Sequence, residues 1–188
     1  LGGMPEGGAA QFTFFGGEPL MNFPLVRRVV AYGEAEAEHL RKRIRWAVTT
    51  NGTVLTDDVV DFLADHRFTV TVSLDGPADV HDAQRPFLGG RGSYAAILPG
   101  LRRLLSRAAV PARVTLTRKC LEARRIVDHL LALGFSEVGV GPVHSGDPEY
   151  DLDEVDSLRM LDEFKGLTRV FLDHAAQHRR YGFSNIVN

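Results

Sequence analysis

The chain has 188 residues, 44% of them hydrophobic and 24% charged, and its net charge at pH 7 is −2. This composition is typical of a soluble globular domain and excludes a disordered chain, while the slightly acidic balance excludes the basic surface that nucleic-acid binding requires. No apolar run is long enough to span a membrane, and residues 1–10 lack the charged and apolar regions of a signal peptide. We therefore expect a cytoplasmic protein with no nucleic-acid or membrane partner.

Segments typical of strands and of helices alternate along the chain, which predicts an α/β fold with a parallel sheet. The predicted strands are short and rich in β-branched or aromatic residues, and they are residues 11–15, 44–49, 68–74, 112–117 and 137–140. Amphipathic patterns predict helices at residues 24–37, 56–66, 93–107 and 122–133. Thr56 is the predicted N-cap of the second helix, and Gly134 is the predicted C-terminal glycine of the fourth.

A longer helix is predicted from Asp153 to about Arg180. Its apolar face is predicted from residues at near-helical spacing, which are Val155, Leu158, Leu161, Phe164, Thr168, Phe171 and Ala175. Five strand–helix units of roughly 35 residues each match the repeat of a (β/α) barrel, although the chain is too short for the usual eight units. Since no repeat, low-complexity tract or linker marks a boundary, we expect residues 1–188 to form a single partial barrel domain.

Small and polar residues follow every predicted strand. The segments are GGEP (residues 16–19), TTNG (49–52), SLDG (73–76), TLTRK (115–119) and GPVHSGD (141–147). Because function gathers at the carboxyl ends of parallel strands, these loops predict a functional face. TTNG and SLDG are also explained as simple turns, since Asn, Asp and Gly accept left-handed backbone conformations.

Glu18 is harder to explain as part of a turn. A helix cap is one possible role, but Asn22 and Pro24 are predicted to supply the cap and the first-turn proline of the following helix. Glu18 is then left without a local function and becomes a candidate ligand-binding residue.

These loops, in this order, resemble those of the radical S-adenosylmethionine (SAM) enzymes, and most closely the peptide- and protein-modifying group that includes the anaerobic sulfatase-maturating enzymes. FFGGEPLM is similar to the GGE motif of that family, TTNGTVL to the end of its third strand, and VSLDGPADVHDAQRPFLGGRGSY to the end of its fourth. The resemblance covers essentially the whole chain, and it is most specific between Phe14 and Tyr94.

The resemblance implies a site for S-adenosylmethionine. Gly16, Gly17 and Glu18 would meet the methionine ammonium group, while Ser73 and Arg85 would hold its carboxylate. Asp75 would face the site or a substrate peptide, or serve only in its turn. The full set of implied cofactor-binding residues is Gly16, Gly17, Glu18, Pro19, Thr50, Asn51, Ser73, Asp75, Arg85, Val140, Pro142 and Val143, with the last three bordering the adenine. No catalytic residue is assigned.

The chain departs from the family in its cysteines. The family binds a [4Fe–4S] cluster through three closely spaced cysteines, whereas Cys120 is the only cysteine here. The resemblance therefore implies that the first of six family strand–helix units is missing or incomplete and that the cysteine-rich C-terminal extension is absent. The chain is expected to be truncated at both ends or to belong to a protein that has lost the cluster loop. The cluster is expected only in the complete protein, and the chain as given is expected to be inactive. Cys120 itself is predicted to be a structural or free thiol.

The complete protein is expected to be an oxidoreductase that modifies a peptide or protein through a 5′-deoxyadenosyl radical, with ferredoxin or flavodoxin as electron donor by family analogy. One alternative is a cluster-less module that binds a peptide or partner without catalysis. A third possibility is an unrelated barrel enzyme that uses GGEP as an anion loop, but a carboxylate there opposes phosphate.

The histidines show no ligand pattern that predicts a metal site. His174 and His178 lie four residues apart on the last predicted helix and are interpreted as surface residues. His144 and Asp147 follow the last predicted strand, where contact with substrate and a plain loop role both remain open.

Overall fold

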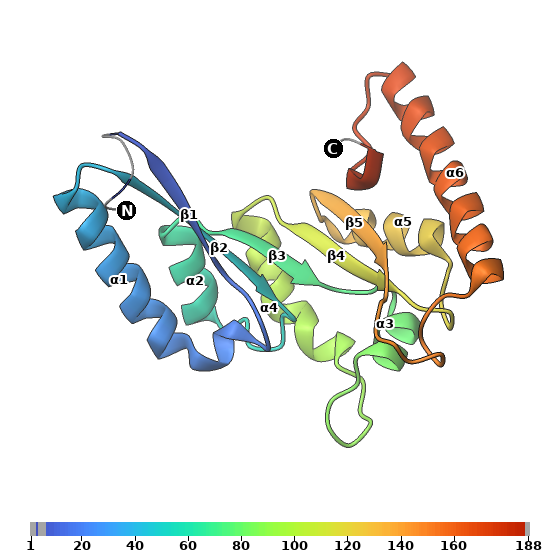
Figure 1. Ribbon diagram of the computed structural model, residues 1–188, viewed down its shortest axis with the longest axis horizontal. Coiled ribbons are helices and arrows are strands. Elements are labelled where there is room, and N and C mark those ends of the chain that lie inside the picture. Colours follow the sequence, from blue (N-terminus) through green and yellow to red (C-terminus); the bar gives the residue numbers. More distant parts are fainter. Residues whose placement is uncertain (1–2, 4–6, 187–188) are drawn as a thin grey trace. The chain divides into compact units, whose positions relative to one another are not determined.

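The computed structural model describes Gly3 and residues 7–186. Strands and helices alternate along the chain (Figure 1). In chain order the elements are β1 (Ala9–Phe14), η1 (Pro19–Asn22), α1 (Phe23–His39), β2 (Arg43–Thr50), α2 (Asp57–Asp65), β3 (Thr69–Ser73), α3 (Ala78–Gln84), α4 (Tyr94–Arg107), β4 (Pro111–Leu116), α5 (Ala123–Leu133), β5 (Glu137–Pro142), α6 (Glu154–Ala176) and η2 (Ser184–Ile186), where η marks a 3-10 helix. The predicted α/β fold is confirmed, and all five predicted strands are present to within two residues at each end.

The chain divides into two compact units. The first comprises Leu1–Val72 and Ile97–Ala108, and the second comprises Ser73–Ala96 and Ala109–Asn188. In the first unit β1 pairs with β2 and β2 pairs with β3, while in the second β4 pairs with β5. Every one of these pairings is parallel, as the alternation of strands and helices predicts.

An aromatic cluster forms part of the core of the first unit. Trp46 of β2 is 3% exposed and stacks on Phe68, while Phe14 of β1 stacks on the same phenylalanine. Phe62 of α2 joins the cluster from the helix side. Such rings bury a large apolar area, so they hold β1, β2 and α2 together.

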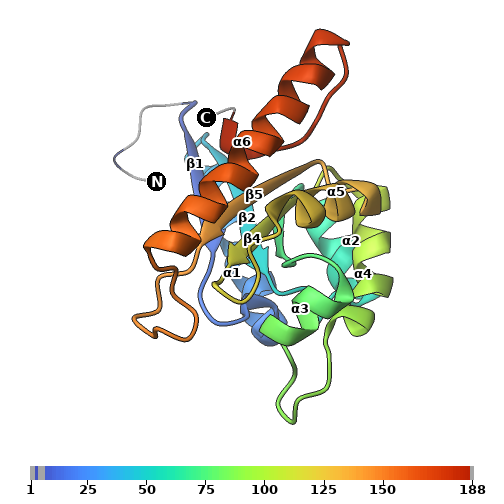
Figure 2. The same ribbon diagram turned by 90° about the vertical axis from the view of Figure 1, so that its right-hand side faces the viewer.

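The second unit buries one face of β4, and α5 packs beside β5. Ala112, Val114 and Leu116 alternate along β4 and are all at most 2% exposed, because successive side chains of a strand point to opposite faces. Ile126 and Leu130 of α5 are fully buried. The helix ends as predicted at Gly134, whose φ of 107° is left-handed. α6 lies beside α5 (Figure 2).

The C-terminal segment continues the edge of β5. Phe183 forms a parallel bridge with Val138, and the side chain of Asn185 bonds both the N–H and the C=O of Val140 (2.8 and 2.6 Å). An amide side chain that offers one donor and one acceptor imitates a neighbouring strand. These contacts provide hydrogen-bond partners for backbone groups on an edge of β5 that would otherwise be unpaired.

The structure corrects the prediction for the last helix. α6 ends at Ala176 rather than near Arg180, and its acidic N-terminus forms a capping box between Asp153 and Asp156. The predicted apolar face is also wrong in its first half, because Val155 and Leu158 are both 58% exposed whereas Leu167 is fully buried.

Helix α3 was not predicted. Its seven residues begin after Pro77 and contain only one apolar residue with a long side chain, Val80, so they lack the extended periodicity from which longer helices are recognised. None of the helices in residues 7–186 is long and apolar enough to cross a membrane.

Candidate functional site

The loop after β1 depends on its two glycines. Gly16 and Gly17 have φ angles of 93° and 51°, which glycine adopts far more readily than other residues. A Cβ built on either glycine would meet no atom within 4 Å. The pair is therefore required for backbone conformation, and it leaves open space on the side where a side chain would project.

The Glu18 carboxylate joins the loop after β1 to the loop after β2. Its Oε1 accepts hydrogen bonds from the Leu20 N–H (3.2 Å) and the Thr50 hydroxyl (2.8 Å), and its Oε2 accepts one from the Asn51 N–H (2.6 Å). Thr50 is 1% exposed, so one of these partners is fixed in the core. The structure thus brings Glu18, Thr50 and Asn51 together.

The prediction that Glu18 has no local function is wrong. Glu18 is the N-cap of η1, and Pro19 occupies the first turn that follows. Asn22 precedes α1, but its side chain makes no capping hydrogen bond, although Pro24 does lie in the first turn as predicted. The two consecutive helices made it difficult to assign the cap from sequence.

Asn51 has a turn role of its own. Its Oδ1 accepts hydrogen bonds from the N–H and the hydroxyl of Thr53 (2.9 and 2.7 Å). Gly52 follows with a φ of 77°, and a Cβ there would lie 2.9 Å from Ile97. The simple-turn interpretation of TTNG therefore describes the Asn51 side chain, while its backbone N–H serves Glu18.

A second cluster follows β3 and lies in the second unit. Asp75 is 1% exposed and accepts hydrogen bonds from Nε and Nη2 of Arg85 (2.5 and 3.3 Å) and from the Thr115 N–H (2.9 Å). Nη2 of Arg85 also lies 3.5 Å from the Thr115 hydroxyl. Ser73, at the end of β3, is half-buried. Among the described residues Nη1 of Arg85 has no partner, so this nitrogen can donate hydrogen bonds to another group.

His81 supports this cluster and was missed in the sequence. Its Nδ1 accepts the Asp75 N–H (3.2 Å), so in the neutral ring the proton is on Nε2, which donates to the Ser93 hydroxyl (3.1 Å). Ser93 in turn donates to the Arg85 carbonyl (2.6 Å). His81 is 1% exposed, and burial lowers its pKa. The four-residue spacing of His81 and Arg85 around one short helix was the signal available in the sequence.

The residues expected beside the adenine lie along β5. Val140 is 2% exposed, and its backbone groups bond Asn185. Pro142 and Val143 are half-buried, and the Val143 N–H bonds the Leu116 carbonyl (2.8 Å). These residues belong to the same unit as Asp75 and Arg85, whereas Glu18 belongs to the other.

The remaining candidates form no metal site. Residues 7–186 with Gly3 contain no group of three or more His, Cys, Asp or Glu side chains that could hold a metal ion. The His174 ring contacts the Tyr181 ring in a tilted arrangement, and its Nδ1 lies 3.0 Å from the Val170 carbonyl oxygen. His144 and Asp147 lie exposed in the loop after β5. Cys120 is a free thiol whose pKa is raised by burial, which makes it less reactive.

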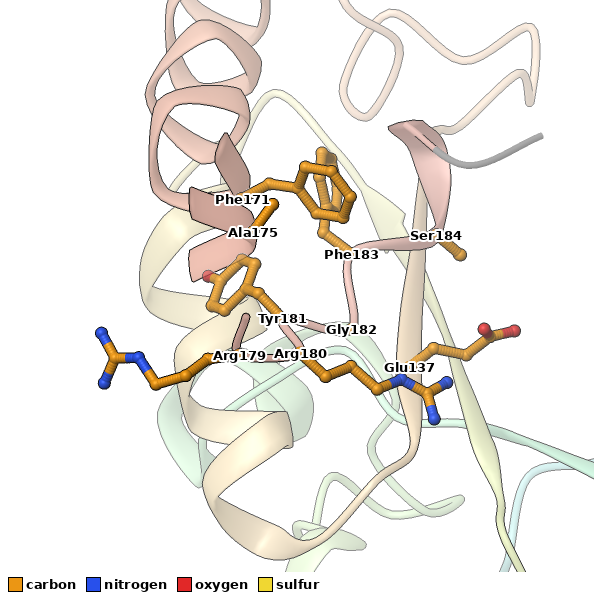
Figure 3. A pocket seen from close by; sticks show the side chains of 9 residues that line it. All are labelled: Glu137, Phe171, Ala175, Arg179, Arg180, Tyr181, Gly182, Phe183 and Ser184. Carbon is orange, nitrogen blue, oxygen red and sulfur yellow. The ribbon is translucent and has the colours of Figure 1, made fainter. Parts of the chain in front are cut away.

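One cavity lies away from the functional face. It has a volume of about 260 Å³ and is lined by Phe171, Tyr181 and Phe183, whose rings lie between α6 and β5 (Figure 3). Glu137, the first residue of β5, also lines it. Because this is the amino end of the strand, the cavity is not where parallel α/β folds place their active sites.

A model of the radical SAM superfamily matches residues 3–117. The chain belongs to the radical SAM superfamily. Among its relatives, an uncharacterized protein of Methanocaldococcus jannaschii is 29% identical over 131 residues, covering 68% of this chain and 44% of that protein. The serine-type anaerobic sulfatase-maturating enzyme of Bacteroides thetaiotaomicron is 37% identical over 94 residues, covering 50% of this chain and 22% of that enzyme.

Solved structures show the same fold. Native anSMEcpe with bound AdoMet and a peptide superimposes with a TM-score of 0.82 at 17% identity, covering 94% of this chain and 51% of that chain. Coproporphyrinogen III oxidase from Escherichia coli, described as a radical SAM enzyme, gives 0.61 at 11% identity, covering 85% of this chain and 40% of that one. The fold is therefore a partial radical SAM barrel, and the chain spans about half or less of the length of these proteins.

Proposed function

We propose that the chain is the S-adenosylmethionine-binding core of a radical SAM oxidoreductase that modifies a peptide or protein. Membership of the superfamily and the two polar clusters at strand ends support this proposal. The observation that carries it is the Glu18 carboxylate, which is held by three hydrogen bonds behind a glycine pair.

Glu18 suits a methionine ammonium group. A carboxylate offers about four acceptor positions, and three of those on Glu18 are taken, which leaves one on Oε2. The bonds from Thr50 and Asn51 fix the carboxylate in place before a ligand arrives. A charge-assisted hydrogen bond to an ammonium would then be formed without further ordering of the side chain.

Arg85 suits the carboxylate at the other end of an amino acid. Asp75 holds its Nε and Nη2, so the guanidinium is oriented while Nη1 stays free among the described residues. The Arg85 side chain is 36% exposed, which leaves it accessible to a ligand. The buried Asp75 would therefore act by orienting Arg85.

The [4Fe–4S] cluster does not fit the residues of this chain, which has one cysteine and, in its described part, no metal-ligating group of three. We propose that the cluster belongs to the complete protein, in which residues 1–188 form a single partial barrel domain. S-adenosylmethionine would supply a 5′-deoxyadenosyl radical for hydrogen abstraction, and the residues described above would bind and orient its amino-acid group. A ferredoxin or flavodoxin would supply electrons.

A peptide or protein substrate is proposed from the relatives. Several of them are named as anaerobic sulfatase-maturating enzymes, and two solved structures of similar fold contain a bound peptide. The alternative function is a module that keeps the fold and binds a peptide or partner without a cluster.

The first prediction tests the cofactor site. In the complete protein, prepared without oxygen, Glu18→Gln and Arg85→Lys should each weaken S-adenosylmethionine binding about 10- to 100-fold, because each loses a hydrogen bond to a charged group worth about 1.5–3 kcal/mol. The glutamine side chain would keep an acceptor oxygen for Thr50, and the lysine side chain would keep a cation beside Asp75, so the fold should survive. Isothermal titration calorimetry measures the affinity.

Glu38→Gln and Arg102→Lys are the matched controls, since both residues are exposed. They should bind S-adenosylmethionine like the wild type. Unchanged affinity in both site variants would overturn the assignment of Glu18 and Arg85.

A further inference from the structure

A second cavity lies on the functional side of the second unit, near the carboxyl end of β4. It has a volume of about 420 Å³ and lies between α3, the turn Thr117–Cys120 and the start of α5. The turn is closed by a hydrogen bond from the Cys120 N–H to the Thr117 carbonyl (2.9 Å). We call this cavity the Thr117 pocket.

Two side chains of the Thr117 pocket have polar atoms without partners. Across the described residues three buried side-chain polar atoms lack a hydrogen bond, and two of them, Gln84 Nε2 and Thr117 Oγ1, belong to residues that line this pocket. Thr117 is only 6% exposed. A buried polar group without a partner is unfavourable, so two in one pocket indicate that a bound group satisfies them. Neither atom is solvent-exposed in the structure, so a bound group would contact it only after the side chain rotates.

The pocket also presents positive charge. α5 begins here, and although Glu122 at its N-cap makes no side-chain capping bond, the Glu163 carboxylate accepts the N–H of Arg124 in the first turn (2.9 Å), so the charge of the pocket comes from its side chains. Among the lining residues four are cations, Arg118, Lys119, Arg125 and Arg159, and two are acids, Asp79 and Glu122.

The cations of the Thr117 pocket form ion pairs in which a ligand carboxylate can take the place of an acidic side chain. Arg125 pairs with Asp79 and Glu122, each 61% exposed in its side chain, and Lys119 pairs with Glu149, also 61% exposed. Arg118 pairs with Asp153, which is 51% exposed, and with Asp156. Exposed pairs contribute little stability, so a ligand carboxylate can replace Asp79, Glu122 or Glu149 at small cost.

Both unpartnered groups can donate, and the charges around them favour an acceptor that is anionic. We propose that the Thr117 pocket binds a carboxylate side chain of an acidic peptide. Thr117 and Gln84 would donate to the carboxylate or to the neighbouring peptide carbonyl, and Arg125 would face its charge. The inference rests on the proposed function, because the peptide would be the substrate or partner of the same protein.

Cys120 lines the pocket and provides a direct measurement of occupancy. The experiment measures the rate at which iodoacetamide alkylates Cys120 in the complete protein, identified by mass spectrometry of its peptide. The probes are acetyl-Ala-Asp-Ala-amide and acetyl-Ala-Asn-Ala-amide at millimolar concentration. We expect the aspartate peptide to slow alkylation at least about threefold, as occupancy at twice the Kd would, and the asparagine peptide to have little effect.

Thr117→Val and Gln84→Met separate binding from structure. Each removes an unsatisfied polar atom, so the melting temperature should stay equal or rise, while the protection of Cys120 should be lost. Thr168→Val is the matched control, because this hydroxyl lies on α6 and donates to the Phe164 carbonyl (2.8 Å). It should leave the protection unchanged.

Equal protection by both peptides, absence of protection, or protection that persists in both variants would overturn the proposal. Titration of the same variants with S-adenosylmethionine should give wild-type affinity. Failure of the wild type to bind S-adenosylmethionine, with peptide protection intact, would count against the proposed function and leave the Thr117 pocket as a peptide site.

Discussion

Glu18 shows how one carboxylate can serve a loop and remain available to a ligand. Its three hydrogen bonds come from residues close in the chain, such as Leu20, and from Thr50, which is 32 positions away. The GGEP segment alone predicts a flexible loop that contains a candidate ligand-binding carboxylate. The contact with Thr50 could not be predicted from local pattern, because it depends on the pairing of β1 with β2.

His81 should make stability depend on pH. Burial lowers its pKa in the folded protein, so the unfolded chain binds more protons near pH 6.5 and below. Stability is therefore complete above that pH and should fall as pH decreases through it, by up to about 1.4 kcal/mol per pH unit. A proton on Nδ1 would also point at the Asp75 N–H, which would lose its acceptor. The nearby charges are Asp75 and Asp82, which raise the pKa of His81, and Arg85, which lowers it.

The measurement is urea unfolding at pH 7.5, 6.5 and 5.5 for the wild type and His81→Gln. Glutamine can make both hydrogen bonds and does not titrate, so the free energy of unfolding of His81→Gln should fall less steeply as pH decreases. His129→Gln is the comparison: burial also lowers the pKa of this histidine, so its replacement should flatten the decline too, but less than His81→Gln because the ring is less buried. An identical decline in wild type and His81→Gln would contradict this role of His81.

At the scale of elements, two helical glycines look alike in sequence and differ in the structure. Gly100 lies within α4 and Gly166 within α6. A Cβ on Gly100 would lie 2.2 Å from the Leu55 carbonyl oxygen, whereas a Cβ on Gly166 would meet nothing within 4 Å. Only the packing of α4 against the loop at Leu55 distinguishes them.

The substitution Gly100→Ala should destabilise the protein by about 2 kcal/mol, because the clash with backbone exceeds the helix-propensity gain of about 1 kcal/mol. Gly166→Ala should stabilise it by about 0.5–1 kcal/mol for the propensity gain alone. Thermal unfolding of both variants measures the difference. Stabilisation by both substitutions would show that α4 does not approach Leu55 this closely.

Helix α6 illustrates where sequence patterns fail. Its apolar residues recur at helical spacing, yet Val155, Leu158 and Leu161 are exposed while Leu167 is buried. Periodicity predicts a helix and an apolar face, but the neighbour that covers a face is set by tertiary packing. Here α5 is the neighbour, and it reaches only part of α6.

At the scale of the whole molecule, the chain spans about half or less of the length of the relatives that it matches, and its single cysteine does not supply the ligands of a [4Fe–4S] cluster. The complete protein should therefore be tested for its cluster. We expect at least about four iron and four sulfide per chain after anaerobic preparation, and three cysteines spaced CxxxCxxC upstream of Leu1. Cys120→Ser should keep the iron, because Cys120 is not expected to be a ligand.

The measurement is iron and sulfide analysis of the complete wild-type protein and of its Cys120→Ser variant. A complete protein without the cysteine motif and without iron would favour the cluster-less binding module. Loss of iron in Cys120→Ser would show that this cysteine is a ligand after all.

The sequence by itself determined the five strands, most helices, the polar residues at the strand ends and the resemblance to the radical SAM family, because periodicity, capping and turn residues act within a few positions of one another. Only the tertiary structure decided that Glu18 bonds Thr50, that Asp75 is buried against Arg85, and that the Asp75 carboxylate receives the N–H of Thr115, 40 positions away. Such contacts depend on which strands pair and which side chains are buried together, and a single sequence does not encode these in any local pattern.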